Sequence, residues 1–407
     1  MAEAYLVGGT RTPVGRYGGA LSPVRPDDLA AITISQLIKA SGIDPAAVDE
    51  VILGNANGAG EENRNVARMA ALLAGLPVSI PGITVNRLCA SGMSAITMAS
   101  HMIKSGAADI VIAGGVESMS RAPWVMEKPD KAFAKPGAVF DTSIGWRFTN
   151  PQFLSGELSR EGKATFSMPE TAEEVARVYG ISREDCDEFA VQSHAKAIAA
   201  IQAGHFRDEI VPVIVKHRKG EMVVDTDEGP REGTTLEVLA GLRPVVKGGS
   251  VVTAGNASSL NDGASAILVV SERALKKYGL NARARIIDGQ AVGLEPEIMG
   301  MGPVPATRKV LDRAGLKIDE IGAMEINEAF ASQSLASIRE LSVDPDIVNR
   351  DGGAIALGHP LGSSGSRIVI SLLGRIEREL AGAERKLGVA TMCVGVGQGS
   401  AILLEGV

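Results

Sequence analysis

Residues 48–63 read VDEVILGNANGAGEEN, and residues 318–333, about 270 positions later, read IDEIGAMEINEAFASQ. Each stretch starts at an acidic pair, continues as a short apolar strand and ends in a polar turn. Two further matches follow in the same order: the small-residue corner after Leu88 with residues 352–370, and the strand at 108–120 with 386–405. Three ordered matches predict a duplicated α/β unit, although any α/β protein repeats such elements.

Strand-like and helix-like patterns alternate at both ends of the chain, which favours an α/β protein with a mainly parallel sheet. Residues 4–9 and 50–56 have the pattern of strands, and residues 26–42 that of a helix closed by a glycine. The stretch between the halves differs, with loop-like pieces, a helix pair and a hairpin. The predicted division is therefore a first half (1–120 with 250–274), an inserted α+β loop domain (121–249) and a second half (275–407).

Composition limits the possible function. The 407 residues are 45% hydrophobic, include 48 glycines and carry a net charge of −7 without a basic block, which argues against nucleic-acid or membrane-surface partners. The start lacks a secretory signal, and no apolar run reaches the roughly 18–20 residues of a membrane helix. Three scattered cysteines give no disulfide framework, so we expect a cytoplasmic protein.

Two of these cysteines follow strand-like runs. Cys89 lies in TVNRLCASGMSA (84–95), and a thiol in the first turn of a helix is expected to have a lowered pKa and to act as a nucleophile. Cys393 precedes alternating glycines, whose N–H groups can approach a bound atom closely. The alternatives are an inert core cysteine at 89 and an incidental thiol at 393.

A histidine and an amide complete the candidate constellation. His359, in the stiff turn ALGHPLG, can accept a proton or bind an oxyanion, unless it only hydrogen-bonds the backbone of its turn. Asn327 ends the second unit's strand, where α/β sheets bind ligands. Cys186 stands among carboxylates that raise a thiol pKa, and we interpret it as non-catalytic. The same holds for the remaining histidines, two in helix patterns (His101 and His194) and two in charged, solvated contexts (His205 and His217).

Several motifs together resemble the thiolase family of acetyl-CoA C-acyltransferases. They are NRLCASG (86–92), GGVESMS (114–120), GNAS (255–258), NDG (261–263), NEAF (327–330), GHPLG (358–362) and CVGVGQG (393–399). The resemblance spans essentially the whole chain. It implies two βαβαβαββ halves stacked as α/β/α/β/α layers, with a loop domain inserted in the first half.

The resemblance also implies roles for these residues. Cys89 is the nucleophile that becomes acylated, and His359 activates it. His359 and a water held by Asn327 form one oxyanion hole, and the N–H groups of Cys89 and Gly395 form a second. Cys393 is the general acid and base. No metal and no tightly bound cofactor is expected, because no metal-spaced cluster occurs and the glycine-rich start departs from a dinucleotide fingerprint.

Contacts to coenzyme A, the expected substrate, carry over less completely. The family positions near the pantetheine or nucleotide are Met168, Arg231, Ser258, Ala329 and Phe330. Arg231 could steer the CoA phosphates or be a solvated cation. Short-chain biosynthetic members have a histidine where Ser167 stands and a serine where Val238 stands. Both departures argue against the usual acetoacetyl-CoA preference.

Four stretches resemble a narrower branch, the 3-oxoadipyl-CoA thiolases of aromatic-compound breakdown. They are NRNVARM (63–69), DTSIGWRF (141–148), SMPETAE (167–173) and MCVGVGQG (392–399). That substrate ends in a carboxylate, which Arg147 or a neighbouring cation could bind.

Other functions remain open: an acetyl-CoA acetyltransferase or general 3-ketoacyl-CoA thiolase, a cysteine hydrolase, and a non-enzymatic carrier. A condensing synthase would have histidine or asparagine at position 393. Family analogy predicts a homotetramer or homodimer.

Overall fold

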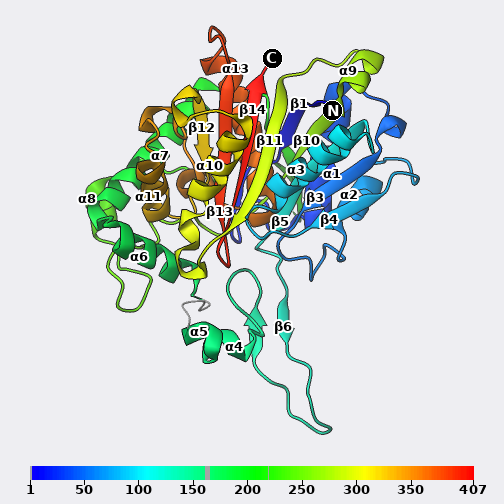
Figure 1. Cartoon of the computed structure of the whole chain (residues 1–407). Coiled ribbons are helices and arrows are strands. Elements are labelled where there is room, and N and C mark those ends of the chain that lie inside the picture. The colour runs from blue at the N-terminus through cyan, green and yellow to red at the C-terminus, as the bar shows by residue number, and fades with distance from the viewer. Residues whose placement is uncertain (1, 161–165, 219) are drawn as a thin grey trace.

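A computed structural model describes residues 2–160, 166–218 and 220–407 (Figure 1). One sheet runs in the order β12-β13-β14-β11-β1-β10-β5-β3-β4, with the short β2 (Gly15–Arg16) paired to β10. The first-half strands are β1 (Ala4–Arg11), β3 (Glu50–Gly54), β4 (Gly82–Val85), β5 (Ile110–Ser118) and β10 (Asn261–Ser271). The second-half strands are β11 (Ala284–Gly293), β12 (Ala323–Ile326), β13 (Leu387–Val394) and β14 (Gln398–Gly406).

The two halves of the sheet repeat one topology. In the first half β1 pairs antiparallel with β10, β10 antiparallel with β5, and β5 parallel with β3. In the second half β11, β14, β13 and β12 repeat that series. The parallel neighbour β4 has its counterpart in a single bridge from Met324 to Val348. The predicted duplication is therefore confirmed, and each half has the order βαβαβαββ.

The prediction of a mainly parallel sheet is wrong. In each half the last two strands of the sheet, β5 with β10 and β13 with β14, pair antiparallel, so antiparallel pairs outnumber parallel ones. Within the sheet, the two halves are joined by the pairing of β1 with β11, over Tyr5 with Arg285 and Leu6 with Ala284.

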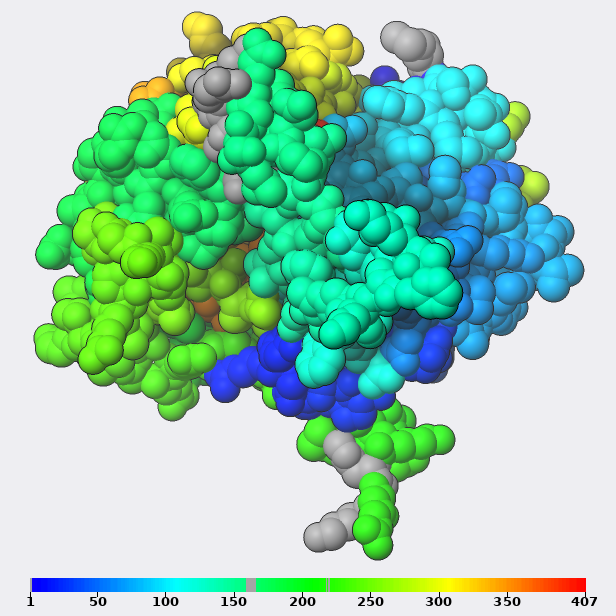
Figure 2. Space-filling model, turned by 90° about the horizontal axis from the view of Figure 1, so that it is seen from below, coloured from blue at the N-terminus to red at the C-terminus, as the bar shows by residue number. Residues whose placement is uncertain are grey.

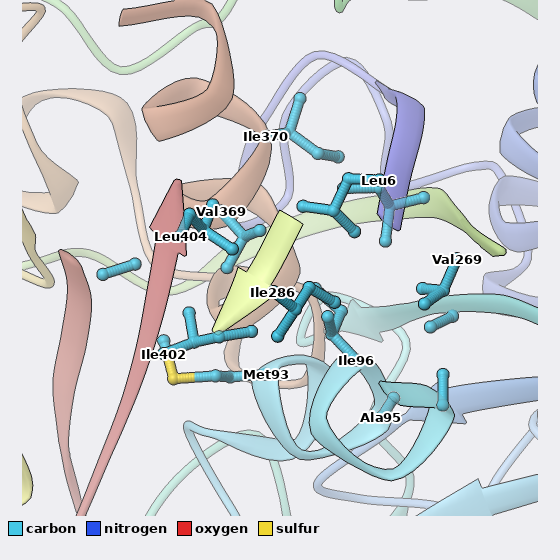
Figure 3. Close-up of a cluster of buried hydrophobic side chains, with 14 of the residues drawn as sticks. Leu6, Met93, Ala95, Ile96, Val269, Ile286, Val369, Ile370, Ile402 and Leu404 are labelled. Atoms are coloured by element: carbon cyan, nitrogen blue, oxygen red, sulfur yellow. The ribbon is translucent and has the colours of Figure 1, made fainter. Parts of the chain in front are cut away.

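Successive side chains of a strand point to opposite faces of the sheet, so each strand contributes to a central core and to an outer core. On β10, Ile267 and Val269 face a central core, while Leu268 and Val270 face an outer core. β14 alternates in the same way between the central core and an outer core of its own. Two helices, α3 (Ser91–Ser105) and α13 (Leu361–Glu379), fill the centre (Figure 3).

The outer faces are covered by helices from each half. The first half uses α1 (Pro26–Ser41) and α2 (Val66–Leu73), and the second uses α10 (Pro303–Ala314) and α11 (Ala331–Leu341). The result is the α/β/α/β/α stack. Short elements complete both halves: α9 (Glu272–Tyr278), α12 (Ala354–Leu357) and the 3₁₀ helices Pro45–Ala47, Pro296–Met301, Ile318–Glu320 and Pro345–Ile347. The predicted helix at 26–42 is α1, which starts at Pro26 and is capped after Ser41 by Gly42, with φ 66°.

Glycines let the two central helices cross closely. A Cβ added to Gly92 on α3 would lie 2.8 Å from the Gly362 carbonyl oxygen, and one on Gly365 of α13 would lie 2.5 Å from the Met93 nitrogen. Real side chains do not tolerate such distances, so the crossing requires glycine on both helices. It also brings the N-terminal ends of α3 and α13 together.

The segment between β5 and β10 carries the remaining elements. They are β6 (Trp124–Met126), β7 (Val139–Asp141), α4 (Pro151–Leu154), α5 (Glu157–Arg160), α6 (Met168–Tyr179), α7 (Arg183–Ala203), β8 (Val213–His217), β9 (Gly220–Val224) and α8 (Leu236–Ala240). The predicted helix pair is α6 and α7, and the predicted hairpin is β8 with β9. β6, α4 and α5 lie below the sheet in Figure 1, and Figure 2 shows this segment lying across the lower face. Within the described ranges, none of the helices is long and apolar enough to cross a bilayer.

Candidate active site

The corner between β4 and α3 is built by hydrogen bonds around Leu88. Leu88 has a φ of 45°, a strained value for a residue with a branched side chain. Its N–H donates to Asn86 Oδ1 at 2.8 Å, and its carbonyl accepts from Ser91 Oγ at 2.6 Å. Ser91 Oγ also accepts from the Arg87 N–H at 2.9 Å. Cys89 therefore leaves this corner in a fixed direction, two residues before α3 begins and not in its first turn as predicted.

The expected low pKa of Cys89 is wrong. Burial raises the pKa of its thiol to about 11, and the negative charge of Glu117 acts in the same direction. The backbone N–H groups of Gly395 and of Cys89 itself contact the sulfur and lower the pKa only in part. Cys89 is consequently a thiol near neutral pH and requires a base to become a nucleophile. The two N–H groups predicted to form an oxyanion hole do converge at this sulfur.

Cys393 lies at the end of β13, beside Cys89. Burial raises its pKa above the ordinary thiol value, and a charge on Cys89 raises it further. Its sulfur lies 3.0 Å from the side-chain amide of Gln333 on α11. The Ser334 N–H lies 2.6 Å from one atom of the Gln333 side-chain amide. Because this N–H can only donate, that atom is the amide oxygen. The amide nitrogen therefore faces the Asn327 carbonyl oxygen at 3.2 Å. Cys393 is thus a protonated thiol, suited to deliver a proton.

His359 is fixed between α12 and α13. The backbone N–H of His359 donates to Asn261 Oδ1 at 2.8 Å. Its ring nitrogen Nδ1 lies 2.6 Å from Ser364 Oγ. Ser364 Oγ also donates to the Pro360 carbonyl at 3.0 Å, so both contacts are satisfied when Nδ1 carries the proton and Ser364 accepts it. Burial and the charge of Arg367 lower the pKa of His359 to about 3. The imidazole is therefore neutral, with an unprotonated Nε2.

Nε2 of His359 and both side-chain amide atoms of Asn327 are buried and have no hydrogen-bond partner among the described residues. Asn327 follows β12 and is held there by its N–H, which donates to the Thr391 carbonyl at 3.0 Å. Unpartnered buried polar atoms are costly. These atoms are therefore available to a substrate carbonyl or to a water between them.

A cavity of about 140 Å³ opens at Cys89. Apolar side chains form much of its wall, and Asn57, Thr142 and Arg147 add polar groups. The volume is below the ~300–1,000 Å³ of clefts that hold drug-sized ligands, which suits a short acyl group. The lining is Ala56, Asn57, Leu88, Cys89, Thr142, Ser143, Ile144, Gly145, Trp146, Arg147, Met168, Leu361, Gly395 and Val396.

The five predicted CoA contacts fall into two places. Met168 lines the Cys89 cavity, and Ala329 and Phe330 pack in one cluster with Met168 and Cys393. Ser258 donates its N–H to the Ala329 carbonyl at 2.9 Å. Arg231 lies apart, in a second cavity of about 280 Å³ that Val238 also lines.

Sequence reasoning missed three polar residues around the site. Glu117, Gln333 and Ser364 contact the backbone or the side chains of the predicted residues, but each is hidden in an apolar strand, a helix or a glycine-serine run. His205 lies in a charged and partly exposed context, where it pairs with Asp351 at 2.7 Å. Cys186 is buried, and burial followed by its carboxylate neighbours raises its pKa to about 12. In the part of the chain that the structure describes, no three His, Cys, Asp or Glu side chains gather as a metal site.

Comparisons with known proteins match the chain over nearly its whole length. Residues 4–273 match the family model described as "Thiolase, N-terminal domain", and residues 280–406 match "Thiolase, C-terminal domain". The chain is 54% identical to "Beta-ketoadipyl-CoA thiolase" of Pseudomonas aeruginosa, over 99% of both chains. It is 52% identical to "3-oxoadipyl-CoA/3-oxo-5,6-dehydrosuberyl-CoA thiolase" of Escherichia coli, over 100% of both. A solved acetyl-CoA acetyltransferase of Bacillus anthracis is 40% identical, with a TM-score of 0.91 over 100% of this chain and 99% of that one.

Proposed function

Because the chain belongs to the thiolase family, we propose that it cleaves a 3-oxoacyl-CoA with coenzyme A, through an acyl group held on Cys89. The substrate proposed is 3-oxoadipyl-CoA, which yields succinyl-CoA and acetyl-CoA. Relatives named for this substrate share more than half of their residues with this chain. Coenzyme A enters as a substrate, and no bound cofactor takes part.

In the first half-reaction, the sulfur of Cys89 attacks the C3 carbonyl, and its proton passes to Nε2 of His359. The N–H groups of Cys89 and Gly395, which contact the sulfur, bind the oxyanion that forms. The bond between C2 and C3 then breaks, and its electron pair becomes the enolate of acetyl-CoA. Cys393 protonates C2, while Asn327, through a water, and the newly protonated His359 stabilise the enolate oxygen.

In the second half-reaction, the thiolate of Cys393 takes the proton of the incoming CoA thiol. The CoA sulfur attacks the acyl group on Cys89, and Cys89 leaves and recovers its proton from His359. The nitrogen that is a base in the first step is therefore an acid in the last. Splitting the transfer in this way predicts ping-pong kinetics.

The observation that carries this proposal is the set of groups around the Cys89 sulfur, namely hydrogen-bond donors, a second thiol and a neutral imidazole. Cys89 is a protonated thiol at a strained corner, touched by two N–H donors and neighboured by a second thiol. The buried His359 stays neutral and keeps a free nitrogen for its proton. An inert core cysteine would need none of these.

The test is a panel of 3-oxoacyl-CoAs with and without a terminal carboxylate, assayed for thiolysis with the native chain and with Cys89→Ser. We expect fastest cleavage of 3-oxoadipyl-CoA and, in the mass spectrum of protein exposed to succinyl-CoA, one succinyl group on Cys89. No acyl adduct and no thiolysis of any member would overturn the proposed activity. Preferred cleavage of acetoacetyl-CoA would favour the second candidate, an acetyl-CoA acetyltransferase, which the likeness to the Bacillus anthracis enzyme supports.

Three further parts of the proposal concern the whole molecule. The inserted segment 121–249 is proposed to act as a loop domain over CoA, because it supplies Met168 and Arg231 to the two cavities. We also propose a cytoplasmic protein, consistent with three cysteines that are all free, and an assembly of two or four copies. Size-exclusion chromatography with light scattering tests the last point.

A further inference from the structure

Among the described residues that line the Cys89 cavity, Arg147 alone is charged. Leu88, Ile144, Trp146, Leu361 and Val396 give the cavity apolar walls that suit methylene groups. Arg147 is half-buried, and its guanidinium adds a positive charge to a largely apolar cavity wall.

Neighbouring groups hold Arg147 in place. Its guanidinium donates to Asn57 Oδ1 at 2.9 Å. Asn57 is fixed in turn, because its Nδ2 donates to the Thr142 hydroxyl at 2.9 Å and to the Thr142 carbonyl at 3.1 Å. The Asn57 N–H donates to Glu117 Oε1 at 3.1 Å. Asn57 thus links the arginine to the rigid end of β5.

The loop that leads into Arg147 is anchored at two points, Thr142 and Trp146. Thr142 Oγ1 donates to the Pro123 carbonyl at 2.6 Å, and the Trp146 indole N–H donates to the Phe166 carbonyl at 2.8 Å. A side chain on such a loop loses little further freedom when it binds a ligand.

The partner of Arg147 is not a carboxylate of the described chain. Within residues 2–160, 166–218 and 220–407, no ion pair joins it to an aspartate or glutamate. The nearby Glu117 is already engaged, since its carboxylate accepts from the N–H groups of Ala56, Asn57 and Gly362. A planar guanidinium matches a carboxylate through two parallel hydrogen bonds.

We propose that Arg147, oriented by Asn57, is the binding subsite for a carboxylate at the far end of the acyl chain, which makes the site selective for dicarboxylic 3-oxoacyl-CoAs. This inference rests on the proposed acyl transfer through Cys89 and adds the group that selects among substrates. After C2–C3 cleavage the same arginine would hold the free carboxylate of the succinyl group on Cys89.

The experiment compares two substrates of equal chain length, 3-oxoadipyl-CoA and 3-oxohexanoyl-CoA, in which a methyl group replaces the carboxylate. The variants are Arg147→Met, which removes the charge, and Arg147→Lys, which keeps it but loses the planar fork. Lys131→Met, on the exposed stretch between β6 and β7, is the matched control for loss of one positive charge. Asn57→Ala tests the orienting contact. Thermal melting confirms that each variant is folded.

We expect Arg147→Met to lower kcat/KM for 3-oxoadipyl-CoA about 10- to 100-fold, and to leave that for 3-oxohexanoyl-CoA within about twofold. Arg147→Lys and Asn57→Ala should fall between, and Lys131→Met should match the native protein. Equal losses on both substrates, or no loss on either, would overturn the subsite. If the native protein does not cleave 3-oxoadipyl-CoA at all, the proposed substrate falls instead.

Reaction with succinyl-CoA and butyryl-CoA gives a second readout that needs no C–C cleavage. Mass spectrometry follows the acyl group on Cys89 over time. Arg147→Met should slow succinylation and not butyrylation, and slower reaction with both would count against the subsite.

Discussion

The two halves of the molecule place different chemistry at equivalent positions. Cys89 lies two residues before α3, and His359 lies two residues before α13. Glu117 is the penultimate residue of β5, and Cys393 is the penultimate residue of β13. Asn55 directly follows β3, and Asn327 directly follows β12. The close crossing of α3 and α13 brings the first pair of corners together, so the proposed nucleophile and the proposed base are counterparts from the two repeats.

The difference lies in what each polar group contacts. Asn55 Nδ2 donates to the Val116 carbonyl at 3.0 Å, and Glu117 accepts three backbone N–H groups. The equivalent Asn327 side chain has no hydrogen-bond partner among the described residues, and the hydrogen-bond contact of the Cys393 thiol there is with the Gln333 amide. The first half therefore uses its strand-end polar groups to build the corner that carries Cys89. The second half leaves its own groups available for substrate.

The largest effect is expected from the corner of the first half. Cys89→Ser should lower thiolysis at least ~10³-fold, because a hydroxyl is far less acidic than the thiol and cannot give its proton to His359 as readily. Cys186→Ala, which removes a thiol outside the site, should keep its activity per folded molecule. Thiolysis rates and intact mass after exposure to acyl-CoA measure both. Full activity of Cys89→Ser would remove the basis of the proposed mechanism.

Substitution of Asn327 and of Asn55 should affect different properties, catalytic rate in the first case and stability in the second. Asn327→Ala should lower kcat/KM by about 10²–10³-fold, the usual cost of one oxyanion-binding group, with little change in stability. Asn55→Ala should instead cost about 1–3 kcal/mol of unfolding free energy by leaving buried backbone groups without a partner. Steady-state kinetics and urea unfolding on both variants measure this. The reverse pattern, with Asn55 affecting rate and Asn327 affecting stability, would refute the division between the halves.

Sequence patterns predict the repeated order of strands and helices, and the reason is local. The acidic pairs before β3 and β12, the glycine that ends α1 and the periodicity of α6 and α7 are each contained within about 20 residues. The antiparallel closure of each half escapes such reasoning, because strand direction depends on how the two strands are connected, by the long inserted segment between β5 and β10 and by a tight turn between β13 and β14. Here β13 turns straight into β14 around Val396, with φ 64°.

The sequence identifies the candidate residues but does not predict their electrostatics. Motifs identify Cys89, Asn327, His359 and Cys393, and the described geometry brings both thiols to one place. The pKa of Cys89 depends on burial by residues more than 250 positions away and on Glu117, which reads as one more strand residue. Ser364 is equally hidden in its glycine-serine run, and only its distance to His359 reveals it.

A smaller effect is expected from the pH dependence of Glu117. Burial raises its pKa from 4.5 to about 7, against three backbone N–H donors that lower it. The folded protein holds this proton more tightly than the unfolded chain, so the stabilising contribution is complete below pH 4.5 and lost as pH rises through about 7. The loss of unfolding free energy between pH 5 and pH 8 should therefore be about 1–3 kcal/mol greater in the native protein than in Glu117→Gln.

Urea unfolding of both proteins at pH 5 and at pH 8 tests this prediction. Glu325, whose pKa burial also raises to about 7, contributes equally to both proteins. The same loss in both would show that Glu117 does not titrate in this range.

The smallest effect concerns how the second half orients its base. Ser364 does not touch the substrate and acts only through His359, whose Nδ1–H it accepts at 2.6 Å. Without it, the neutral imidazole can carry its proton on Nε2, and that tautomer cannot receive the proton of Cys89. The backbone of His359 stays fixed by Asn261, so the ring is misprotonated part of the time but not displaced. Ser364→Ala should therefore lower kcat about three- to tenfold with KM unchanged.

Ser364→Thr, which keeps the hydroxyl, should restore the rate. Ser363→Ala, next to it but bonded to Ser265, should leave the rate unchanged. If all three variants lost kcat equally, the hydroxyl would serve packing of α13 and would not set the tautomer of the base.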